Sequence, residues 1–359
     1  MDGIYLYGIV EAPIKVDLVV AGVDGSSPVH IVAKKSLGCV VSDYSGEAFT
    51  ALSKEQIVRR LLAHQWVVER VMEEHTVLPV KFGTILDSPQ DVLDLLSQGR
   101  SKLGDAVAAI RDKAEIEVAA TWDTSRVLRE IGNEEDVVRA KEAIARTGQP
   151  AREDLVRVGQ MVKAHMDKRR EGYRERMVSL LRPLCVDLAP NALVSDDLVM
   201  NVAFLVDRSQ QAGFDAGVQR LDKLFQNEVN FRVVGPLPPY TFSTVEVTRL
   251  TPELVDEARR ALRLGDVTSE AEVTMAYRRM AAAEQRNLER GSSPNNLVAK
   301  LKQASDVLLR YCRAQREAAG SERPDAPNGP GDRCLFDVAI RKSRSADVEP
   351  ARFGGAVRV

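Results

Sequence analysis

The four histidines are the first residues to consider for chemistry, because imidazole serves as a metal ligand and as a general base near neutral pH. They stand at His30, His64, His75 and His165, and none belongs to an HExxH or comparable motif. His64 and His75 are eleven residues apart, which on a helix is about 16 Å along the axis and too far for a shared metal ion. We therefore expect structural, partly buried histidines.

Other reactive side chains show no catalytic arrangement. The cysteines never stand in a CxxC spacing, which argues against a zinc site or a disulfide framework; they are Cys39, Cys185, Cys312 and Cys334. The chain contains no GxxxxGK[ST], GxGxxG or GxSxG motif. Adjacent carboxylates such as Glu73 and Glu74 point in different directions on a helix. We expect no enzymatic activity, no cofactor and no metal.

The run KRREGYRER, residues 168–176, is the one candidate for nucleic-acid binding. Its cations and single aromatic could follow a phosphate backbone. Glu171 and Glu175 interrupt it, however, and the chain has a formal net charge of −2 with only 5% aromatic residues. A solvated helix face is the better interpretation, and we expect no nucleic-acid partner.

The elements that position these residues begin with strands at 4–10, 29–33 and 38–41. In the helix that follows, apolar and histidine side chains recur every three or four residues from Ile57 to His75, which places them on one face. Ser53 is the expected N-cap, with Gln56 completing a capping box. A strand at 77–85, a helix at 89–112 and a strand at 116–122 complete an α+β domain over residues 1–122.

Residues 123–183 are expected to form a long helical connector, broken near Gly148 and Pro150. A second α+β domain follows over residues 184–250, with strands at 184–188 and 198–206 and a helix carrying Phe214 to Phe225. Its last two strands flank the run GPLPPYTF, residues 235–242. Three prolines and a glycine cannot lie inside a regular sheet, so this run should close one strand and form a stiff corner before the next.

Several of these segments resemble signatures of the gas vesicle protein F/L family. They are FLVDR and FRVVGPLPPYTF in the second domain and IYLYGIV and VLPVKFGTIL in the first. They occur in the family's order across most of residues 1–250. The resemblance implies a modified ferredoxin-like fold for the first domain. The motif residues are expected either to shape the fold or to contact a partner, and they are Pro79, Phe82, Gly83, Gly235, Pro236, Pro238, Pro239, Tyr240 and Phe242.

The resemblance also implies a function. Proteins of this family are thought to be accessory or minor structural components that bind the small hydrophobic shell protein during gas vesicle nucleation and assembly. The expected partners are therefore the main shell protein and other gas vesicle accessory proteins. Binding could pair an exposed sheet edge with the client or cover its apolar helix in a groove, and we expect the first domain to supply that surface. The resemblance does not separate an F member from an L member, and it leaves the oligomeric state open.

The N-terminus lacks the basic and apolar regions of a signal peptide, and no apolar run approaches the roughly 20 residues that cross a bilayer. A cytoplasmic, gas vesicle-associated protein without a membrane partner is expected.

Residues 251–318 change character and are expected to form a three-helix module. The segments EAEVTMAYRRMAAAEQRN and LVAKLKQASDVLLRYC resemble helices II and III of a J-domain, and Thr251 with Pro252 should start the first helix. Where a working J-domain carries His-Pro-Asp, this chain has Gln285, Arg286 and Asn287. Stimulation of Hsp70 is therefore not expected, although an Hsp70 co-chaperone-like adaptor is the alternative function.

The remaining residues are divided into a linker at 319–332, rich in glycine, proline and charge, and a strand with its tail at 333–359. The strand CLFDVAIRKS, residues 334–343, is expected to pair with a sheet edge of the second α+β domain, because an isolated strand would leave its backbone groups unpaired.

Overall fold

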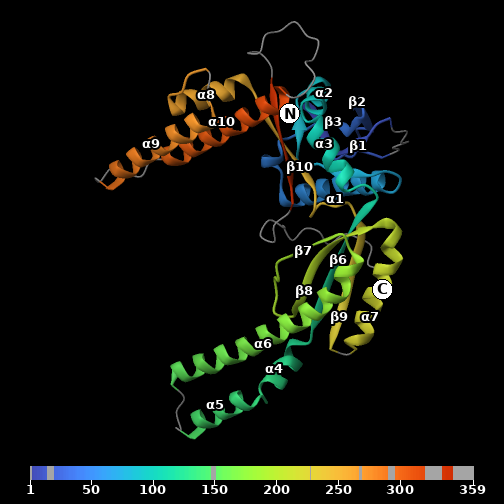
Figure 1. Cartoon of the computed structure of the whole chain (residues 1–359), viewed down its shortest axis with the longest axis vertical. Helices are drawn as coiled ribbons and strands as arrows, with labels where there is room; N and C mark the ends of the chain where they lie inside the picture. The colour runs from blue at the N-terminus through green and yellow to red at the C-terminus, as the bar shows by residue number, and fades with distance from the viewer. Residues whose placement is uncertain are drawn as a thin grey trace. The chain divides into compact units, whose positions relative to one another are not determined.

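The computed structural model (Figure 1) describes residues 2–13, 20–146, 151–226, 228–266, 269–289, 296–319 and 334–342. Its helices and strands form two compact units. Met1–Arg111 and Ser243–Arg341 make the first, and Asp112–Phe242 with Lys342–Val359 makes the second. The expected α+β class is confirmed.

The first unit contains a sheet, the helices that cover it and a three-helix module. Its elements are β1 (Asp2–Glu11), β2 (Val29–Lys34), β3 (Leu37–Ser45), α1 (Lys54–Met72), β4 (Val77–Pro79), β5 (Ile85–Leu86), α2 (Pro89–Gln98), α3 (Arg100–Ala109), β10 (Thr244–Leu250), α8 (Pro252–Leu262), α9 (Glu270–Glu289), α10 (Leu297–Ala319) and β11 (Leu335–Arg341).

The main sheet has the order β2-β3-β1-β4, with β5 also paired to β1. β10 and β11 form a separate two-stranded sheet, which meets the end of β4 where the Lys81 amide donates to the Val245 carbonyl at 2.9 Å. β11 pairs antiparallel with β10 along its whole length. Side chains of β1, β3 and β4 and of α2 and α3 form one core, to which β10 contributes Val245 and β11 contributes Phe336 and Val338.

The three-helix module has its own core. Buried side chains of α8, α9 and α10 pack together with Leu250 at the end of β10, and the three helices lie side by side in Figure 1. Thr251 caps α8 by accepting from the Leu254 amide, with Pro252 in the first turn. The expected start of this helix is confirmed.

The second unit contains a four-stranded sheet of order β7-β8-β6-β9 and its helices. The elements are β6 (Lys113–Trp122), α4 (Thr124–Ile131), α5 (Glu135–Arg146), α6 (Arg152–Leu181), β7 (Asp187–Pro190), β8 (Leu198–Asp207), α7 (Gln211–Leu224) and β9 (Val229–Leu237). α4 and α5 pack along the long helix α6, as Figure 1 shows. Met177 and Leu181 of α6 enter the core beneath the sheet.

The unit boundaries differ from those expected at residues 122 and 250. β6 pairs with β8 and β9 and so belongs to the second unit, whereas β10 pairs with β11 and belongs to the first. The alternation of apolar residues within a strand does not specify which strands it pairs with, and the partners here lie far away in sequence. The C-terminal strand forms as expected and pairs with β10, but in the first unit.

Three local expectations also need correction. The helix expected over 89–112 is two helices, because Gly99 ends α2 and begins α3. The strand expected over 77–85 is interrupted by a turn, in which Gly83 has a φ of +83°. β9 does not end at Gly235 but continues to Leu237, with a register shift opposite Ile116 that accommodates Gly235 and Pro236.

Candidate functional site

The inner face of α1 is fixed to the sheet by an aromatic and histidine cluster. The helix begins at the expected capping box between Ser53 and Gln56. His64 is buried, and its Nδ1 lies 3.0 Å from the Tyr5 hydroxyl. Burial lowers the pKa of His64 to about 3, so the ring is neutral. The expectation that this histidine is buried is confirmed.

The VLPVKFGT motif surrounds this same cluster. Pro79 in β4 pairs with Gly8 of β1. The Phe82 ring packs edge-on against His64, with 5.7 Å between ring centroids. The Gly83 amide donates to the Tyr5 hydroxyl at 3.0 Å. The motif therefore holds the end of β4 against the buried side of α1.

The outer face of α1 has the opposite character. Val58, Leu62 and Trp66 follow one another at intervals of four residues and so lie along one side of the helix. Their exposed fractions are 48%, 46% and 61%. We call these three residues the α1 stripe. The stripe consists of two aliphatic side chains and a tryptophan that are exposed to solvent. The opposite side of the same helix is packed against the sheet.

Sequence reasoning missed the α1 stripe. It identified one apolar face from Ile57 to His75 and did not separate the second, although α1 carries apolar residues on two sides. A helix that is apolar on two sides has more apolar surface than one core contact needs, and that was the available signal.

The GPLPPYTF corner is held by a buried carboxyl group. The Thr241 amide donates to Glu115 Oε2 at 2.7 Å, and the Thr241 hydroxyl donates to Oε1 at 2.6 Å. Both residues are almost fully buried. Gly235 has a φ of +142°, and a side chain there would meet the Glu115 carbonyl oxygen at 2.8 Å. These contacts all lie within the second unit.

The rest of the corner is compact. The Tyr240 amide donates to the Pro238 carbonyl at 2.7 Å, and the Phe242 amide donates to the Pro239 carbonyl at 3.1 Å. The Phe242 ring packs beside Leu205 of β8. Pro236, by contrast, is exposed on β9. Most corner residues thus make packing contacts or hydrogen bonds within the second unit, whereas the VLPVKFGT motif belongs to the first unit.

The remaining candidates for chemistry do not assemble into a reactive site. His165 Nε2 lies 2.9 Å from Asp136, and this hydrogen bond lowers the pKa of the Asp136 carboxyl. The cysteines are free thiols, and burial raises the pKa of Cys39. Among the described residues no group of three or more His, Cys, Asp or Glu side chains could hold a metal ion.

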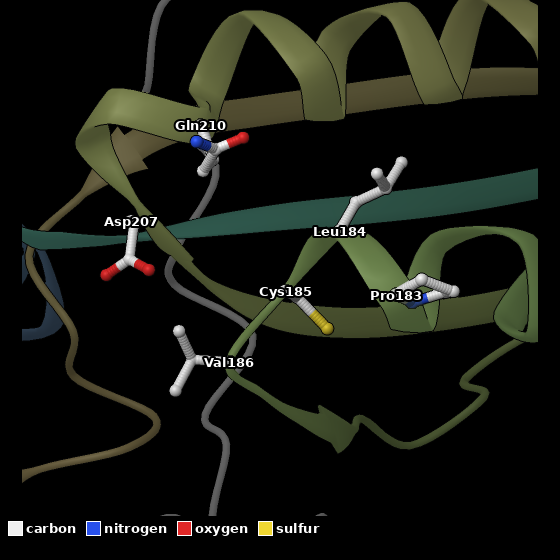
Figure 2. A pocket seen from close by; sticks show the side chains of 6 residues that line it. All are labelled: Pro183, Leu184, Cys185, Val186, Asp207 and Gln210. Atoms are coloured by element: carbon white, nitrogen blue, oxygen red, sulfur yellow. The ribbon is translucent and has the colours of Figure 1, made fainter.

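A shallow depression in the second unit has a volume of about 210 Å³. Figure 2 shows its lining residues: Pro183, Leu184, Cys185, Val186, Asp207 and Gln210. Sites for small molecules usually occupy roughly 300–1,000 Å³. Burial raises the pKa of the Cys185 thiol, which disfavours the thiolate that a nucleophile requires.

Several cations of the basic run on α6 form ion pairs or ring contacts within the second unit. Arg169 pairs with Glu130 at 2.5 Å and with Glu134 at 3.4 Å. Arg170 lies over the Trp122 ring, 5.4 Å from its centroid. Arg174 pairs with Glu171. Cations held in this way are poorly available to a phosphate backbone.

The tripeptide Gln285, Arg286 and Asn287 lies in the helical backbone near the end of α9. Gln285 is exposed. The side chains of the other two lie outside the described part of the chain. Among the described helices, none is both long and apolar enough to cross a membrane.

Comparison with known proteins extends these observations. A family model described as "Gas vesicle synthesis protein GvpL/GvpF" matches residues 3–244. Gas vesicle protein F of Microcystis aeruginosa (strain PCC 7806) is 26% identical over 245 residues, which is 67% of this chain and 98% of that protein. Gas vesicle protein F of Streptomyces sp. (strain CB03234) is 29% identical over 220 residues, covering 61% and 89%.

Solved structures agree. The crystal structure of GvpF from Microcystis aeruginosa has a TM-score of 0.56 at 25% identity, covering 67% of this chain and 98% of that one. GvpF from Anabaena sp. PCC7120 has a TM-score of 0.57 at 22% identity, covering 67% and 95%. Because the family model spans well over half of the sequence, the chain belongs to the GvpL/GvpF family of gas vesicle synthesis proteins.

Proposed function

We propose that this protein binds the small hydrophobic shell protein of gas vesicles and holds it during nucleation and assembly, in the cytoplasm and without catalysing a reaction. Family membership supports the pathway. The α1 stripe carries the finer proposal, because it is an apolar surface in the N-terminal unit, where we expect the client to bind.

The stripe suits an apolar helix as its ligand. Residues spaced by four form a ridge along a helix, and such ridges pack into the grooves of a second helix. Tryptophan is among the residues that contribute most to protein interfaces. Because the inner face of α1 is anchored through His64 and its neighbours, the stripe is presented without a large loss of conformational freedom on binding.

The test is co-expression of the full chain with the shell protein. The full chain is needed because β10 and β11 complete the N-terminal core, so residues 1–150 alone would lack part of it. The variant carries Leu62→Glu and Trp66→Ala. Leu155→Glu is the matched control, since Leu155 is 58% exposed on α6 in the second unit.

The wild type and the control should keep the shell protein soluble and co-elute with it. The stripe variant should lose both properties while its circular dichroism spectrum stays native. Equal recovery of the shell protein with the folded stripe variant would refute the assignment of the site.

Other gas vesicle accessory proteins are further proposed partners, and the same co-elution assay serves for each. No structural observation favours the Hsp70 adaptor. We expect Hsp70 ATP turnover to be unchanged by this protein, because the His-Pro-Asp tripeptide is replaced.

A further inference from the structure

β11 lies beyond the part of the chain that the family match accounts for, since that match ends at residue 244. It nevertheless completes the core of the first unit. Its register with β10 runs without a break from Leu335 opposite Leu250 to Arg341 opposite Thr244. The fifteen residues 320–334 lie between α10 and β11 in the sequence. An element added after a long connection thus fills a place in a core that forms largely from residues 4–110.

The outer edge of β11 is recognised by a side chain. Gln98, the last residue of α2, donates from Nε2 to the Cys334 carbonyl at 3.2 Å. Its Oε1 accepts from the Phe336 amide at 3.0 Å. One glutamine amide therefore supplies the donor and acceptor that a neighbouring strand would offer. Because both hydrogen bonds are made to backbone atoms, this contact recognises an extended backbone and not a particular sequence.

The side chains of β11 are buried against neighbouring elements on both faces of the strand. Phe336 and Val338 are 2% and 0% exposed and enter the core formed with α2 and α3. Asp337 points to the opposite face, as strand alternation requires, and is also buried. Consecutive aromatic, acidic and aliphatic residues are thus all enclosed.

Asp337 gives the place its specificity. Its carboxylate lies 3.5 Å from Arg310 and 3.6 Å from Arg313, both on α10. Arg310 also donates to the Thr248 hydroxyl of β10 at 2.7 Å. Burying a carboxylate is costly unless cations pair with it, and an apolar residue at this position would leave both arginines without this partner. The two arginines therefore select an acidic residue at this position.

The end of β11 at Arg341 is the most exposed part of the strand. A surface depression of about 190 Å³ runs along residues 337–341 of β11, with Lys102 and Arg313 at its margin. Arg341 itself is exposed and pairs with Glu246 at 3.0 Å. Detachment could start at this solvent-facing end without first opening the core around Phe336.

We propose that β10 and the side chains around it form a binding site for an extended segment with consecutive aromatic, acidic and aliphatic residues. We call this site the β10 slot; it consists of the edge of β10 together with Gln98, Arg310 and Arg313. Residues 334–341 are its tethered ligand, and a segment of the same chemistry from another protein binds by adding a strand to β10. The β10 slot is independent of the α1 stripe. Because the resident strand belongs to the same chain, its effective concentration at the slot is high, and a competitor must be locally concentrated or bind more tightly.

The test uses a labelled peptide with the sequence of residues 334–342, its cysteine replaced by serine, as the probe. The receptor is the full chain carrying Phe336→Ala and Asp337→Ala, which weakens its own strand. This variant should bind the probe with a stoichiometry of one. The wild-type chain should bind it at least about tenfold more weakly, because its own strand competes. A probe carrying Phe336→Ala is the matched control and should not bind.

The arginines are tested by a double-mutant cycle. Adding Arg310→Gln and Arg313→Gln to the receptor should weaken the acidic probe severalfold and change the affinity of a probe carrying Asp337→Asn much less. Absence of probe binding by a receptor with a native circular dichroism spectrum would overturn the proposal, as would binding that is insensitive to Phe336→Ala.

A second variant covers the case in which the receptor does not fold. A protease site placed within residues 320–333 of the otherwise wild-type chain is cut after folding. Exchange of the resident strand for the labelled probe supports the proposal, whereas permanent retention of the resident strand overturns it. Strand exchange between intact chains, seen as dimers by light scattering, would make a second copy the occupant and overturn the assignment to another protein.

Discussion

The hydrogen bond between Thr241 and Glu115 provides a direct test of how the proline corner is held. Thr241→Val preserves the shape of the side chain but removes the hydroxyl, which donates to Glu115 Oε1 at 2.6 Å. Leaving a buried acceptor without its hydrogen-bond donor costs about 1–3 kcal/mol. Both partners are buried, so water cannot replace the lost donor. The free energy of unfolding of the second unit should fall by about that amount.

Thr241→Ser is the matched control. It keeps the hydroxyl and removes one methyl group, which costs about 0.8 kcal/mol. The valine variant should therefore be the less stable of the two, although valine is the more apolar residue at a buried position. This order follows from the carboxyl contact and would not arise if burial of the methyl groups dominated.

The two tryptophans of the chain allow the second unit to be followed by itself. Trp66 lies in the first unit and Trp122 in the second. In a Trp66→Phe background the fluorescence change on urea unfolding reports Trp122, which is 3% exposed when folded. With a urea dependence of about 1–3 kcal/mol per molar, the valine midpoint should shift by roughly 1 M. A valine midpoint equal to that of the background, or lower stability for serine than for valine, would refute the reasoning.

Two further predictions concern His64 and the motif glycines. Burial lowers the pKa of His64 to about 3, so only the unfolded chain, with a pKa of about 6.5, takes up this proton between those values. The unfolding free energy of the first unit should fall as the pH drops from about 6.5 toward 3. The His64→Gln variant should show a pH dependence that is smaller by up to about 1.4 kcal/mol per pH unit. Urea titrations at pH 7 and pH 5 measure the loss of unfolding free energy between the two pH values, and an equal loss in the wild type and the variant would contradict this. Gly235→Ala should destabilise more than Gly83→Ala, because both have positive φ but only Gly235 would place a side chain 2.8 Å from a backbone oxygen, whereas the nearest atom to Gly83 is a Phe49 ring carbon at 3.8 Å. Each glycine substitution should cost about 1–3 kcal/mol, measured by thermal unfolding, and the reverse order would show that the corner yields more easily than the turn.

Much of the local structure could be predicted from the residues alone. Ser53 with Gln56 and Thr251 with Pro252 predicted two helix starts correctly, because a cap is an interaction between residues three positions apart. The buried face of α1 through His64 and Val68 followed from periodicity. Gly99, which divides α2 from α3, is a poor helix former within the single helix expected over 89–112.

The candidate sites were harder to predict. Trp66 and Leu62 are ordinary apolar residues in the sequence, and only the packing of the opposite face of α1 shows that they are left in solvent. Asp337 looked like one polar residue in an alternating strand. Its burial between Arg310 and Arg313 depends on α10 lying across β11, and no pattern within either segment encodes that contact.

Residues close together in the chain are enough to predict most helices and strands, two helix caps, the proline corner and the family, since each depends on neighbouring residues or on short motifs. The tertiary structure alone decided that β6 pairs with β8 and β9 and that β10 turns back to the first unit to meet β11. The physical reason is that an alternating strand buries its apolar side chains equally well in any sheet. Its partner is chosen by the total packing of segments that lie up to hundreds of residues apart, as when Phe336 completes the core begun by Ile4.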